Sequence, residues 1–380
     1  MFKYELTQHT DLRLVEPRHT AEIYAAVERN RAHLRQWLSW VDGVSGIDGI
    51  TMPRRNLHDL AEHGHFTVGI WQHGQLVGML AVHAIDARNR ATSLGYWLDA
   101  QAQGQGIMTR ACRALLDHLF GALQLHRVEI RAAAGNQRSQ AVARRLGFRH
   151  DGTLRQSEWL TGGPVDQMIF SLLCDEWHDT GAHLAFAHPL TGEAELCLLL
   201  PHYAEAIFAL VERNRRHLQY LGWIDGTRSS NDIGSYIRHA LQRMADGSEV
   251  HWGIWCGGDF AGIIGTHPIQ WRDRRAEFGY WLGEEFQGKG LATAAGRAMA
   301  EYCFSVLNLN RLELRIRTDN PRSRAVADRL GFTQEGILRQ AVQSTGKMVD
   351  YACYGLLRAE WETPAGAVEN GQGAGAVLES

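Results

Sequence analysis

A glycine-rich segment occurs twice in the chain, each time between an apolar, strand-like run and a helix-like run. It reads Gln-Ala-Gln-Gly-Gln-Gly over residues 101–106 and Glu-Phe-Gln-Gly-Lys-Gly over residues 285–290. Glycines at such a junction allow backbone N–H groups to crowd around an anion, and the dipole of the following helix adds partial positive charge. The segment therefore predicts a binding site for phosphate groups, with a pyrophosphate as its natural ligand.

Two better-known phosphate loops do not fit this segment. A dinucleotide-binding Gly-x-Gly-x-x-Gly fingerprint would need glycine where Thr109 and Thr293 stand, and neither copy has the Gly-Lys-Ser/Thr ending of a Walker loop. The alternative is that the glycines only make a tight turn. Because the segment stands at the same point of a strand-loop-helix unit in both copies, phosphate binding is favoured over a turn alone.

A second recurring motif places an asparagine three residues before a serine and ends in Leu-Gly-Phe. It reads NQRSQAVARRLGF over residues 136–148 and NPRSRAVADRLGF over residues 320–332. The pattern predicts a helix that begins near the serine and ends at the glycine. Helix capping alone could explain Asn136 and Ser139, and on this pattern that alternative stays open.

The elements around these motifs alternate between strand and helix patterns in the same order in both copies. In the first copy the periodicity predicts a helix over residues 19–38, two strands within residues 65–86, strands at 91–99 and 127–135, and a closing pair of strands around Gly162-Gly163-Pro164. Several neighbouring strands are joined by hairpins. The sequence thus predicts an α/β (α+β) fold with a mixed, mostly antiparallel sheet flanked by helices.

The chain reads as one domain written twice. Adding 184 to a residue number in the first half gives its counterpart in the second over most of the 380 residues, with a one-residue slip between the helix near residue 34 and the strand near residue 66. The repeat is far longer than a solenoid unit, so tandem domains are predicted. We expect domains at residues 1–180 and 181–363 and a flexible tail at residues 364–380.

Composition and charge narrow the class of protein. The formal net charge of −3 gives no sign of a nucleic-acid binder, and no apolar run approaches the roughly 18 residues of a membrane span. The N-terminus lacks a secretory signal pattern, and neither the six cysteines nor the nineteen histidines show the spacing of a metal site. We therefore expect a soluble, cytoplasmic protein with no nucleic-acid partner, no membrane partner and no metal.

Together, the Gln-x-x-Gly-x-Gly segment and the Asn-x-x-Ser motifs followed by Leu-Gly-Phe resemble those of the GNAT acyl-CoA-dependent N-acetyltransferases. More narrowly they look like the RimJ/RimL branch, which acetylates protein N-termini, notably of ribosomal proteins. The resemblance covers nearly all of both copies. It implies two splayed central strands with acetyl-CoA between them. The cofactor-binding residues it implies are Gln101, Gln103, Gly104, Gln105, Gly106, Thr109 and Asn136, and Gln287, Gly288, Lys289, Gly290, Thr293 and Asn320.

The resemblance also implies two side chains for the transfer of an acetyl group to a primary amine. A serine at the Asn-x-x-Ser position would serve the departing thiolate, and a glutamate on the strand after Leu-Gly-Phe would act as the base. These roles fall on Ser139 and Glu158 in the first copy. The second copy keeps Ser323 but has Val342 where the glutamate belongs.

Several alternatives stay open. The acceptor could instead be a small molecule such as an antibiotic or a polyamine, the donor could be succinyl-CoA, and the chain could be a non-catalytic acyl-CoA-binding scaffold. Glu158 could be an exposed strand residue only. Glu277, which stands where the first copy has Ser93, is a candidate substitute for the missing base, with a structural role as its alternative. Because homologous domains often pair through two-fold interfaces, we expect the two copies to dock as an intramolecular pseudo-dimer.

Overall fold

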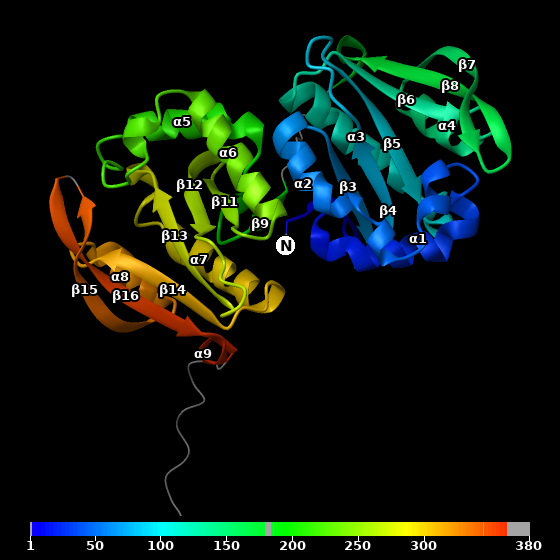
Figure 1. The fold of residues 1–380 in the computed structure, drawn as a ribbon. Helices are drawn as coiled ribbons and strands as arrows, with labels where there is room; N and C mark the ends of the chain where they lie inside the picture. The colour runs from blue at the N-terminus through cyan, green and yellow to red at the C-terminus, as the bar shows by residue number, and fades with distance from the viewer. Residues whose placement is uncertain (1, 179–183, 185, 345, 363–380) are drawn as a thin grey trace, which may run out of the picture.

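The computed structural model describes residues 2–178, 184, 186–344 and 346–362. Its strands form two eight-stranded sheets, one in each copy of the repeat (Figure 1). The tail predicted at residues 364–380 lies outside the described residues, and so does most of the predicted boundary around residue 180. Leu184 and Phe186, close to that boundary, are buried.

The first sheet runs in the order β1-β2-β3-β4-β5-β6-β8-β7. Within it β5 and β6 are parallel neighbours, and the other neighbouring strands are antiparallel. The sheet is therefore mixed and mostly antiparallel, as the sequence predicted. Its strands are β1 (Tyr4–Thr7), β2 (Thr10–Leu14), β3 (Phe66–Gln72), β4 (Gln75–Val82), β5 (Ala91–Leu98), β6 (Arg127–Ala133), β7 (Arg149–Leu160) and β8 (Gly163–Leu173).

Helices cover the first sheet and bury apolar side chains against it. In helix α1, Ile23, Ala26 and Val27 recur at helical spacing and pack into a cluster that includes Trp71 and Trp97 of the sheet. Other helices of this copy pack on β3 and β6. The helices are α1 (Thr20–Leu34), α2 (Met52–His63), α3 (Ile107–Asp117) and α4 (Gln137–Arg145).

The second copy repeats this plan. Its sheet runs in the order β15-β16-β14-β13-β12-β11-β10-β9, and β13 and β14 are its parallel pair. The strands are β9 (Ala187–Pro189), β10 (Ala194–Leu198), β11 (His251–Cys256), β12 (Asp259–Thr266), β13 (Arg275–Leu282), β14 (Arg311–Arg317), β15 (Thr333–Ser344) and β16 (Lys347–Leu357). The helices are α5 (Ala204–Arg213), α6 (Ser230–Ala245), α7 (Leu291–Glu301), α8 (Pro321–Arg329) and α9 (Arg358–Glu362).

In both sheets the two parallel strands separate after a few residue pairs. Residues 91–94 of β5 pair with residues 127–130 of β6, although β5 continues to Leu98. In the second copy the pairing covers only residues 275–277 and 311–313. Beyond these pairs the two strands no longer share a hydrogen-bond ladder. The splayed central strands implied by the family resemblance are confirmed.

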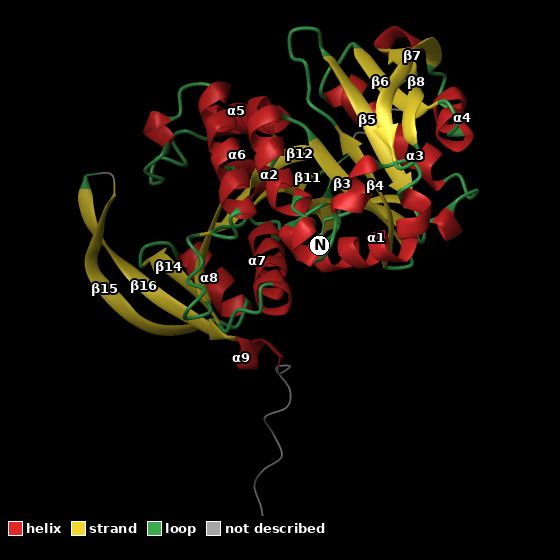
Figure 2. Ribbon diagram, turned by 45° about the vertical axis from the view of Figure 1, so that its right-hand side comes forward, coloured by secondary structure: helices red, strands yellow, loops and turns green. Residues whose placement is uncertain are grey.

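The two copies contact each other through helices that the sequence patterns did not predict. Helix α2 packs against α6, and Figures 1 and 2 show the two helices side by side. Polar contacts flank this packing, because His58 Nε2 lies 3.1 Å from Asp246 Oδ1 and Gln242 Nε2 donates a hydrogen bond to Glu62 Oε1 at 3.3 Å.

The N-terminal end of the first copy also reaches the second. The ring of Phe2 lies 5.1 Å from the ring of Trp252 in an edge-on arrangement. Lys3 N donates a hydrogen bond to Ala187 O at 3.2 Å, and the two residues form an antiparallel bridge between the outer strands of the two sheets. One hydrophobic cluster accordingly contains buried residues of both copies.

No helix in the described ranges is long and apolar enough to cross a membrane. In the same ranges, no group of three or more histidine, cysteine, aspartate or glutamate side chains is placed to hold a metal ion. The cysteines are free thiols, three of them buried.

Candidate active site

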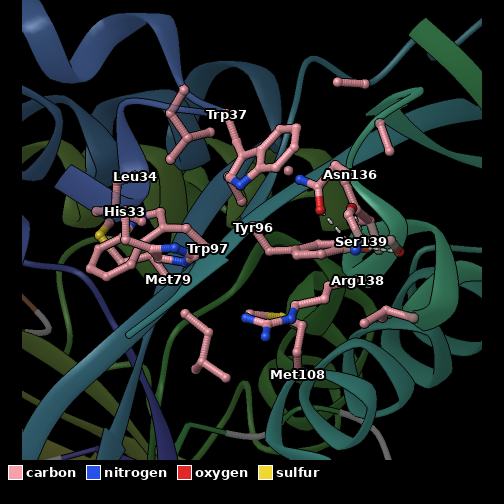
Figure 3. Close-up of a pocket in the computed structure, with 18 of the residues that line it drawn as sticks. His33, Leu34, Trp37, Met79, Tyr96, Trp97, Met108, Asn136, Arg138 and Ser139 are labelled. Carbon is pink, nitrogen blue, oxygen red and sulfur yellow. Dashed lines mark hydrogen bonds between the residues drawn. The ribbon is translucent and has the colours of Figure 1, made fainter. Parts of the chain in front are cut away.

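A cavity of about 1940 Å³ lies in the first copy where β5 and β6 separate. Its wall combines residues from α1 and the segment after it, β5, the glycine-rich segment, the first turn of α3, the start of α4, and the β7–β8 hairpin. Figure 3 shows Trp37, Tyr96, Arg138 and Ser139 around it. The cavity thus brings together the two recurring motifs and the carboxylate that the sequence singled out.

The glycine-rich segment enters α3 through two residues in left-handed conformation. Gly104 has φ 78° and Gly106 has φ 69°, and Gly106 is the N-cap residue directly before α3. In the second copy Gly288 and Gly290 have φ 75° and 78° before α7. No described side chain caps the N-terminus of either helix. The first backbone N–H groups of each helix are therefore available to an anion, as the sequence predicted for a phosphate site.

Gln103 ties the glycine-rich segment to two other elements. Its Nε2 donates to His33 Nε2 just before the end of α1 at 2.8 Å, and its Oε1 accepts a hydrogen bond from Arg138 on α4. Burial, together with the charge of Arg138, lowers the pKa of His33. The ring is therefore neutral at pH 7, and its Nε2 can accept the amide proton.

The buried amide of Asn30 on α1 holds the chain directly before the glycine-rich segment. Asn30 Nδ2 donates to Asp99 Oδ2 at 2.9 Å, and Asn30 Oδ1 accepts from Ala100 N at 3.1 Å. Arg29 Nε and Gln101 N also donate to the Asp99 carboxylate, at 2.8 and 2.9 Å. Burial raises the pKa of Asp99, but these hydrogen bonds and the guanidinium outweigh burial and lower it below its usual value.

The second copy has an equivalent asparagine–carboxylate contact, but its carboxylate stands two residues later in the repeat. Gly283 stands where the first copy has Asp99, and the carboxylate comes from Glu285. Asn214 Nδ2 donates to Glu285 Oε2 at 3.0 Å, and Asn214 Oδ1 accepts from Glu284 N at 2.8 Å. The glycine-rich segment is thus anchored to the first long helix in both copies.

The Asn-x-x-Ser motif combines a helix cap with a partly buried hydroxyl that lines the cavity. Asn136 Oδ1 accepts from Ser139 N at 3.1 Å and caps α4, so the capping alternative is correct for Asn136. Ser139 Oγ instead donates to the Tyr96 hydroxyl on β5 at 3.1 Å, and the Tyr96 hydroxyl donates to Ser139 O at 3.1 Å. Burial raises the pKa of Tyr96 well above its ordinary value, so the phenol keeps its proton. The serine hydroxyl and the phenol form a pair inside the cavity (Figure 3).

Glu158 lines the cavity after a bulge in β7. The register between β7 and β8 shifts between Leu154 and Glu158, and Gln156 within the bulge has φ 49°. Asp166 Oδ1 accepts a hydrogen bond from Gln156 N at 2.9 Å and holds the bulge. The Glu158 side chain is half-buried and accepts a hydrogen bond from the Gln167 amide. Glu158 is therefore not simply an exposed strand residue.

The second copy has the same bulge in β15 but lacks the carboxylate. Gln340 has φ 47°, and its N–H donates to Asp350 Oδ1 at 2.7 Å. Val342 pairs with Val349 on the neighbouring strand. Since Glu158 occupies the same register position in the first copy, the exchange removes a carboxylate from an unchanged backbone position.

The other implied cofactor-binding residues of the first copy fall into two groups. Gln103, Gly104, Gly106, Thr109 and Asn136 line the cavity. Gln101 and Gln105 are exposed and are not among the residues that line it, and Gln105 Oε1 accepts a hydrogen bond from Gln72 Nε2 at 2.9 Å.

The corresponding residues of the second copy make the following contacts. Ser323 N donates to Asn320 Oδ1 at 3.1 Å, Gln287 Nε2 lies 2.7 Å from His217 Nε2, the Lys289 ammonium lies 5.2 Å from the centre of the Phe286 ring, and Thr293 Oγ1 accepts from Arg329 Nε at 3.2 Å. The asparagine cap and the glutamine–histidine contact are therefore the same in both copies.

Sequence patterns missed Tyr96 and Asn30. Tyr96 lies in the Gly-Tyr-Trp-Leu run that recurs at residues 279–282. Asn30 is a polar residue on the buried stripe of α1, and it recurs as Asn214. A buried polar side chain at a repeated position was the available signal, because burial of an amide requires hydrogen-bond partners.

The chain matches the family described as acetyltransferase (GNAT) domain twice, over residues 10–149 and 196–333. Together these matches cover more than half of the chain. Each match contains the parallel strand pair, the glycine-rich segment and the Asn-x-x-Ser motif of its copy.

Three relatives that are similar to this chain have names that refer to different acceptors. The putative ribosomal N-acetyltransferase YdaF of Bacillus subtilis (strain 168) is 35% identical over 182 residues, which are 47% of this chain and 98% of the relative. The ribosomal-protein-serine acetyltransferase of Escherichia coli (strain K12) is 28% identical over 45% of this chain and 96% of that enzyme. The spermidine N(1)-acetyltransferase of the same organism is 40% identical over 97 residues, which are 26% of this chain and 52% of that enzyme.

Among solved structures, the RimL ribosomal L7/L12 alpha-N-protein acetyltransferase in complex with coenzyme A is 29% identical. The similarity covers 46% of this chain and 99% of that chain, with a TM-score of 0.44. The two nearly full-length relatives each correspond to about half of the present chain. The chain therefore belongs to the GNAT acetyltransferase family, as two tandem domains of the RimJ/RimL type.

Proposed function

We propose that the first domain transfers an acetyl group from acetyl-CoA to the α-amino group of a protein N-terminus. The observation that carries this proposal is the meeting, in one cavity, of an uncapped helix N-terminus, the Ser139–Tyr96 hydroxyl pair and the Glu158 carboxylate. These groups answer three needs of acetyl transfer, which are to hold phosphates, to protonate a thiolate and to deprotonate an amine.

The residues around the glycine-rich segment fit a pyrophosphate. An added Cβ at Gly104 would meet no atom within 4 Å, so the backbone is open to a ligand there. Arg110 and Arg138 line the same part of the cavity and would add positive charge for phosphate oxygens. The thioester of the bound donor supplies the activated acetyl group. The same phosphate contacts would hold a succinyl donor.

Glu158 takes a proton from the ammonium form of the acceptor. Gln167 donates to one carboxylate oxygen and leaves the other oxygen to accept the proton. An α-amino group with a pKa near 8 is about a tenth neutral at pH 7, whereas a lysine with a pKa near 10.4 is neutral to only a few parts in ten thousand. A single carboxylate therefore suffices more easily for an α-amine than for lysine.

Ser139 and Tyr96 serve the departing thiolate. As the new C–N bond forms and the C–S bond breaks, the Ser139 hydroxyl gives a proton to sulfur and regains one from the Tyr96 phenol. Solvent then restores the phenol. The two hydroxyl oxygens lie 3.1 Å apart, so the transfer requires only that both hydroxyls rotate: Ser139 turns its proton from Tyr96 to sulfur, and Tyr96 turns its proton from Ser139 O to Ser139 Oγ.

The charge of the cavity favours a peptide N-terminus over a polyamine. Of the described residues that line the cavity, Glu158 is the only acidic one, whereas four are arginines: Arg110, Arg131, Arg138 and Arg145. Since Arg110 and Arg138 are engaged by the donor phosphates, a polycation such as spermidine would find one carboxylate, Glu158, for its several positive charges. A peptide N-terminus brings one positive charge near the reacting atom. The names of two relatives, which refer to ribosomal proteins, support the same acceptor class.

A small-molecule amine is the second candidate acceptor. The observation in its favour is the 40% identity to a spermidine N(1)-acetyltransferase over 97 residues. That similarity covers only about half of the enzyme.

The release of free CoA from acetyl-CoA tests the proposal. Three acceptors are compared at equal concentration: a peptide with a free N-terminus and no lysine, the same peptide with a blocked N-terminus and one internal lysine, and spermidine. We expect the free N-terminus to have the highest kcat/KM, by about tenfold or more, because its amine is most easily deprotonated. A higher kcat/KM for spermidine would overturn the N-terminal assignment and leave acetyl transfer intact.

We also propose that the two domains, divided near residue 180, form an intramolecular pseudo-dimer. Lys3 and Ala187 are equivalent positions of the repeat, and they pair with each other in an antiparallel bridge. A residue that contacts its own equivalent is expected where a two-fold axis passes through an interface. The packing of α2 on α6, which occupy corresponding places in the two copies, supports the same relation. Small-angle scattering should show one compact particle, and two independently tumbling domains would contradict the proposal.

A further inference from the structure

We infer that the second domain is a second acetyl-transfer site, in which Glu277 on β13 accepts the amine proton in place of a residue on β15. This inference rests on the proposed function, because it takes the same acyl donor and a primary amine as acceptor. It adds a second site and a different proton acceptor, which the resemblance of the two copies does not provide.

The second domain keeps the side chains that would serve the donor. Gly288 and Gly290 lead into α7 in the same left-handed conformation, and Asn320 caps α8 while leaving the Ser323 hydroxyl for other partners. Tyr280 stands at the position of the phenol of the first domain. Burial raises its pKa, while the nearby Ser323 side chain lowers it in part, and the phenol oxygen is buried with no hydrogen-bond partner among the described residues. A donor site of the same kind is therefore retained.

The carboxylate on the closing hairpin is lost together with its support. Val342 replaces the glutamate, and Tyr351 replaces the glutamine that donates to that glutamate in the first domain. Neither new side chain can take a proton from an ammonium ion at neutral pH. If the second domain transfers an acetyl group, its proton acceptor must come from another strand.

Glu277 lies where the parallel strands of the second domain separate, at a position whose counterpart in the first domain lines the large cavity. It pairs with Glu313 in the last register position before β13 and β14 separate. In the first domain the equivalent pair is Ser93 with Glu129, and Ser93 lines the large cavity. The equal register places Glu277 on the same side of its strand, where its side chain is 23% exposed.

The ion pairs around Glu277 differ from those at the equivalent place in the first domain. Its Oε2 lies 3.3 Å from Arg315 Nε on β14. In the first domain the equivalent of Arg315, which is Arg131, pairs instead with Glu129 on its own strand. The corresponding Glu313 is occupied by Arg275 and Arg311, at 3.0 and 2.8 Å.

Arg275 replaces an alanine of the first domain two residues before Glu277. By binding Glu313 it leaves Arg315 available to Glu277, so the two exchanges on β13 belong together. Burial raises the pKa of Glu277, with a further rise from Glu313, while Arg315 and His267 lower it. A carboxyl group whose pKa is raised towards the working pH is a stronger base than an ordinary surface glutamate.

The proton and electron balance of the step is simple. Glu277 takes one proton from the ammonium group, and the freed amine lone pair forms the C–N bond to the acetyl carbonyl carbon. The C–S bond breaks, and its electron pair leaves with sulfur. The thiolate takes a proton from the Ser323 hydroxyl, which is resupplied by Tyr280 and then by solvent. The nitrogen is cationic after the attack and gives up its second proton to solvent, and the Glu277 proton passes to water. Two protons leave nitrogen and sulfur takes up one, so one proton is released for each amide formed.

The test uses the full chain with its first site silenced. Four proteins are compared: wild type, Glu158→Gln, Glu277→Gln and the double variant. We expect Glu158→Gln to keep a residual rate, and the additional Glu277→Gln change to lower that rate about 10²-fold in kcat. The KM for acetyl-CoA and the binding of two acetyl-CoA molecules per chain, measured by calorimetry, should not change.

Two controls separate a base from a structural residue. Glu158→Gln with Glu335→Gln removes a partly exposed carboxylate that pairs with Arg311 on β14, and it should keep the residual rate. Glu158→Gln with Glu277→Asp keeps a carboxylate and should recover part of the rate. If Glu277→Gln reduced acetyl-CoA binding to one molecule per chain, a structural role would be shown and the inference would be overturned.

The outcomes distinguish this inference from the proposed function. Equal residual rates for Glu158→Gln and the double variant would overturn the role of Glu277, whereas the first-domain proposal would stand. A full rate in Glu158→Gln that disappears on Glu277→Gln would instead remove the first-domain base and support the second site. Wild type without turnover on any amine would overturn both.

Discussion

Ser139 Oγ on α4 and the Tyr96 hydroxyl on β5 lie 3.1 Å apart, and both residues line the cavity. The two residues come from elements that are 43 positions apart in the sequence. They meet because β5 and β6 separate and α4 begins directly after β6. The pair therefore depends on the splay, and it places a neutral phenol behind a serine hydroxyl.

Tyr96→Phe should lower kcat about 10²-fold, because it removes the group that resupplies the proton to Ser139. The KM for acetyl-CoA should change little, since the phenol is not part of the phosphate site. Steady-state CoA release at saturating acceptor measures both quantities. Ser139→Ala and the double variant complete the cycle, and the two changes should be strongly non-additive because both act on one proton path. Independent, additive effects would count against a shared path.

Glu158→Gln should make turnover depend on acceptor molecules that are already neutral. The rate should then rise about tenfold for each pH unit below the pKa of the acceptor amine, and the loss at pH 7 should be larger for lysine than for an α-amine. The measurement is a pH series with two peptide acceptors. Gln167→Glu offers a contrast, because it replaces the donor to Glu158 with a second carboxylate and should raise the pKa of the pair. The series is run with Glu277→Gln also present, so that the second site does not contribute, and a flat pH profile there would contradict the assignment of the base.

The fold was predictable where it depends on short-range patterns. Alternating apolar residues identified the central strands, and Gly104 and Gly106 identified the turn into α3 because left-handed backbone there favours glycine. Helix α2 was missed because its apolar residues are few and lie in the part of the repeat where the register slips. The short edge strand β1 was missed because four residues are too few to show an alternating pattern. It is recognised only by its hydrogen bonds to β2.

The site was predictable in its motifs but not in its geometry. The sequence could not show that the Ser139 hydroxyl contacts Tyr96 rather than the helix start, because Tyr96 lies on another element. It could not show that Glu158 lines the cavity, because the bulge at Gln156 changes the direction of side chains along β7. Gln105 was expected at the donor site by its place in the motif, yet its side chain points away from the cavity.

His19 should make the protein lose stability as the pH falls below neutral. The ring is buried, its Nδ1 accepts a hydrogen bond from Glu16 N at 3.1 Å, and burial lowers its pKa to about 4. The unfolded chain, with a histidine pKa near 6.5, binds more protons than the folded chain between these values. The contribution of neutral His19 is therefore complete above about pH 6.5 and is lost as the pH falls towards about 4.

Urea midpoints at pH 7 and pH 5 measure this effect. His19→Asn keeps an acceptor for Glu16 N but removes the titrating ring, so its stability should depend less on pH than that of the wild type, by about 1 kcal/mol or more between the two conditions. The exposed His239 on α6 provides a matched control, since His239→Asn should retain the wild-type dependence. An unchanged pH dependence in His19→Asn would show that other groups are responsible.

Phe2→Ala should weaken the contact between the two domains. The Phe2 ring is 7% exposed and packs edge-on against the fully buried Trp252 of the second domain. Removal of a buried phenylalanine costs about 3 kcal/mol or more, although part of that cost belongs to the first domain alone. We expect the chemical unfolding curve to separate into two transitions and the scattering radius to increase. Val306→Ala, which trims a side chain that is 40% exposed, should leave both measurements unchanged.

The carboxylate that binds the first helix is Asp99 in the first domain and Glu285 in the second, and this difference can be tested by variants in both domains. Asp99→Ala removes the group that holds Arg29 and Asn30, so it should raise the KM for acetyl-CoA at the first site about tenfold. In the second domain, a Cβ on Gly283 would lie 2.9 Å from Glu285 Oε2 and 2.8 Å from Leu210 Cδ1. Gly283→Asp should therefore destabilise the protein, because it adds a second carboxylate beside the first.

Gly283→Asp combined with Glu285→Gln restores the arrangement of the first domain, with one carboxylate available to Asn214. This double variant should be more stable than Gly283→Asp alone and should bind acetyl-CoA more tightly at the second site. Thermal unfolding and calorimetric binding provide the two measurements. If Gly283→Asp were as stable as the wild type, or if the second change brought no recovery, the carboxylate would not be the group that anchors the segment to α5. Recovery in both measurements would show that a carboxylate at either position 283 or position 285 can anchor the segment to Asn214.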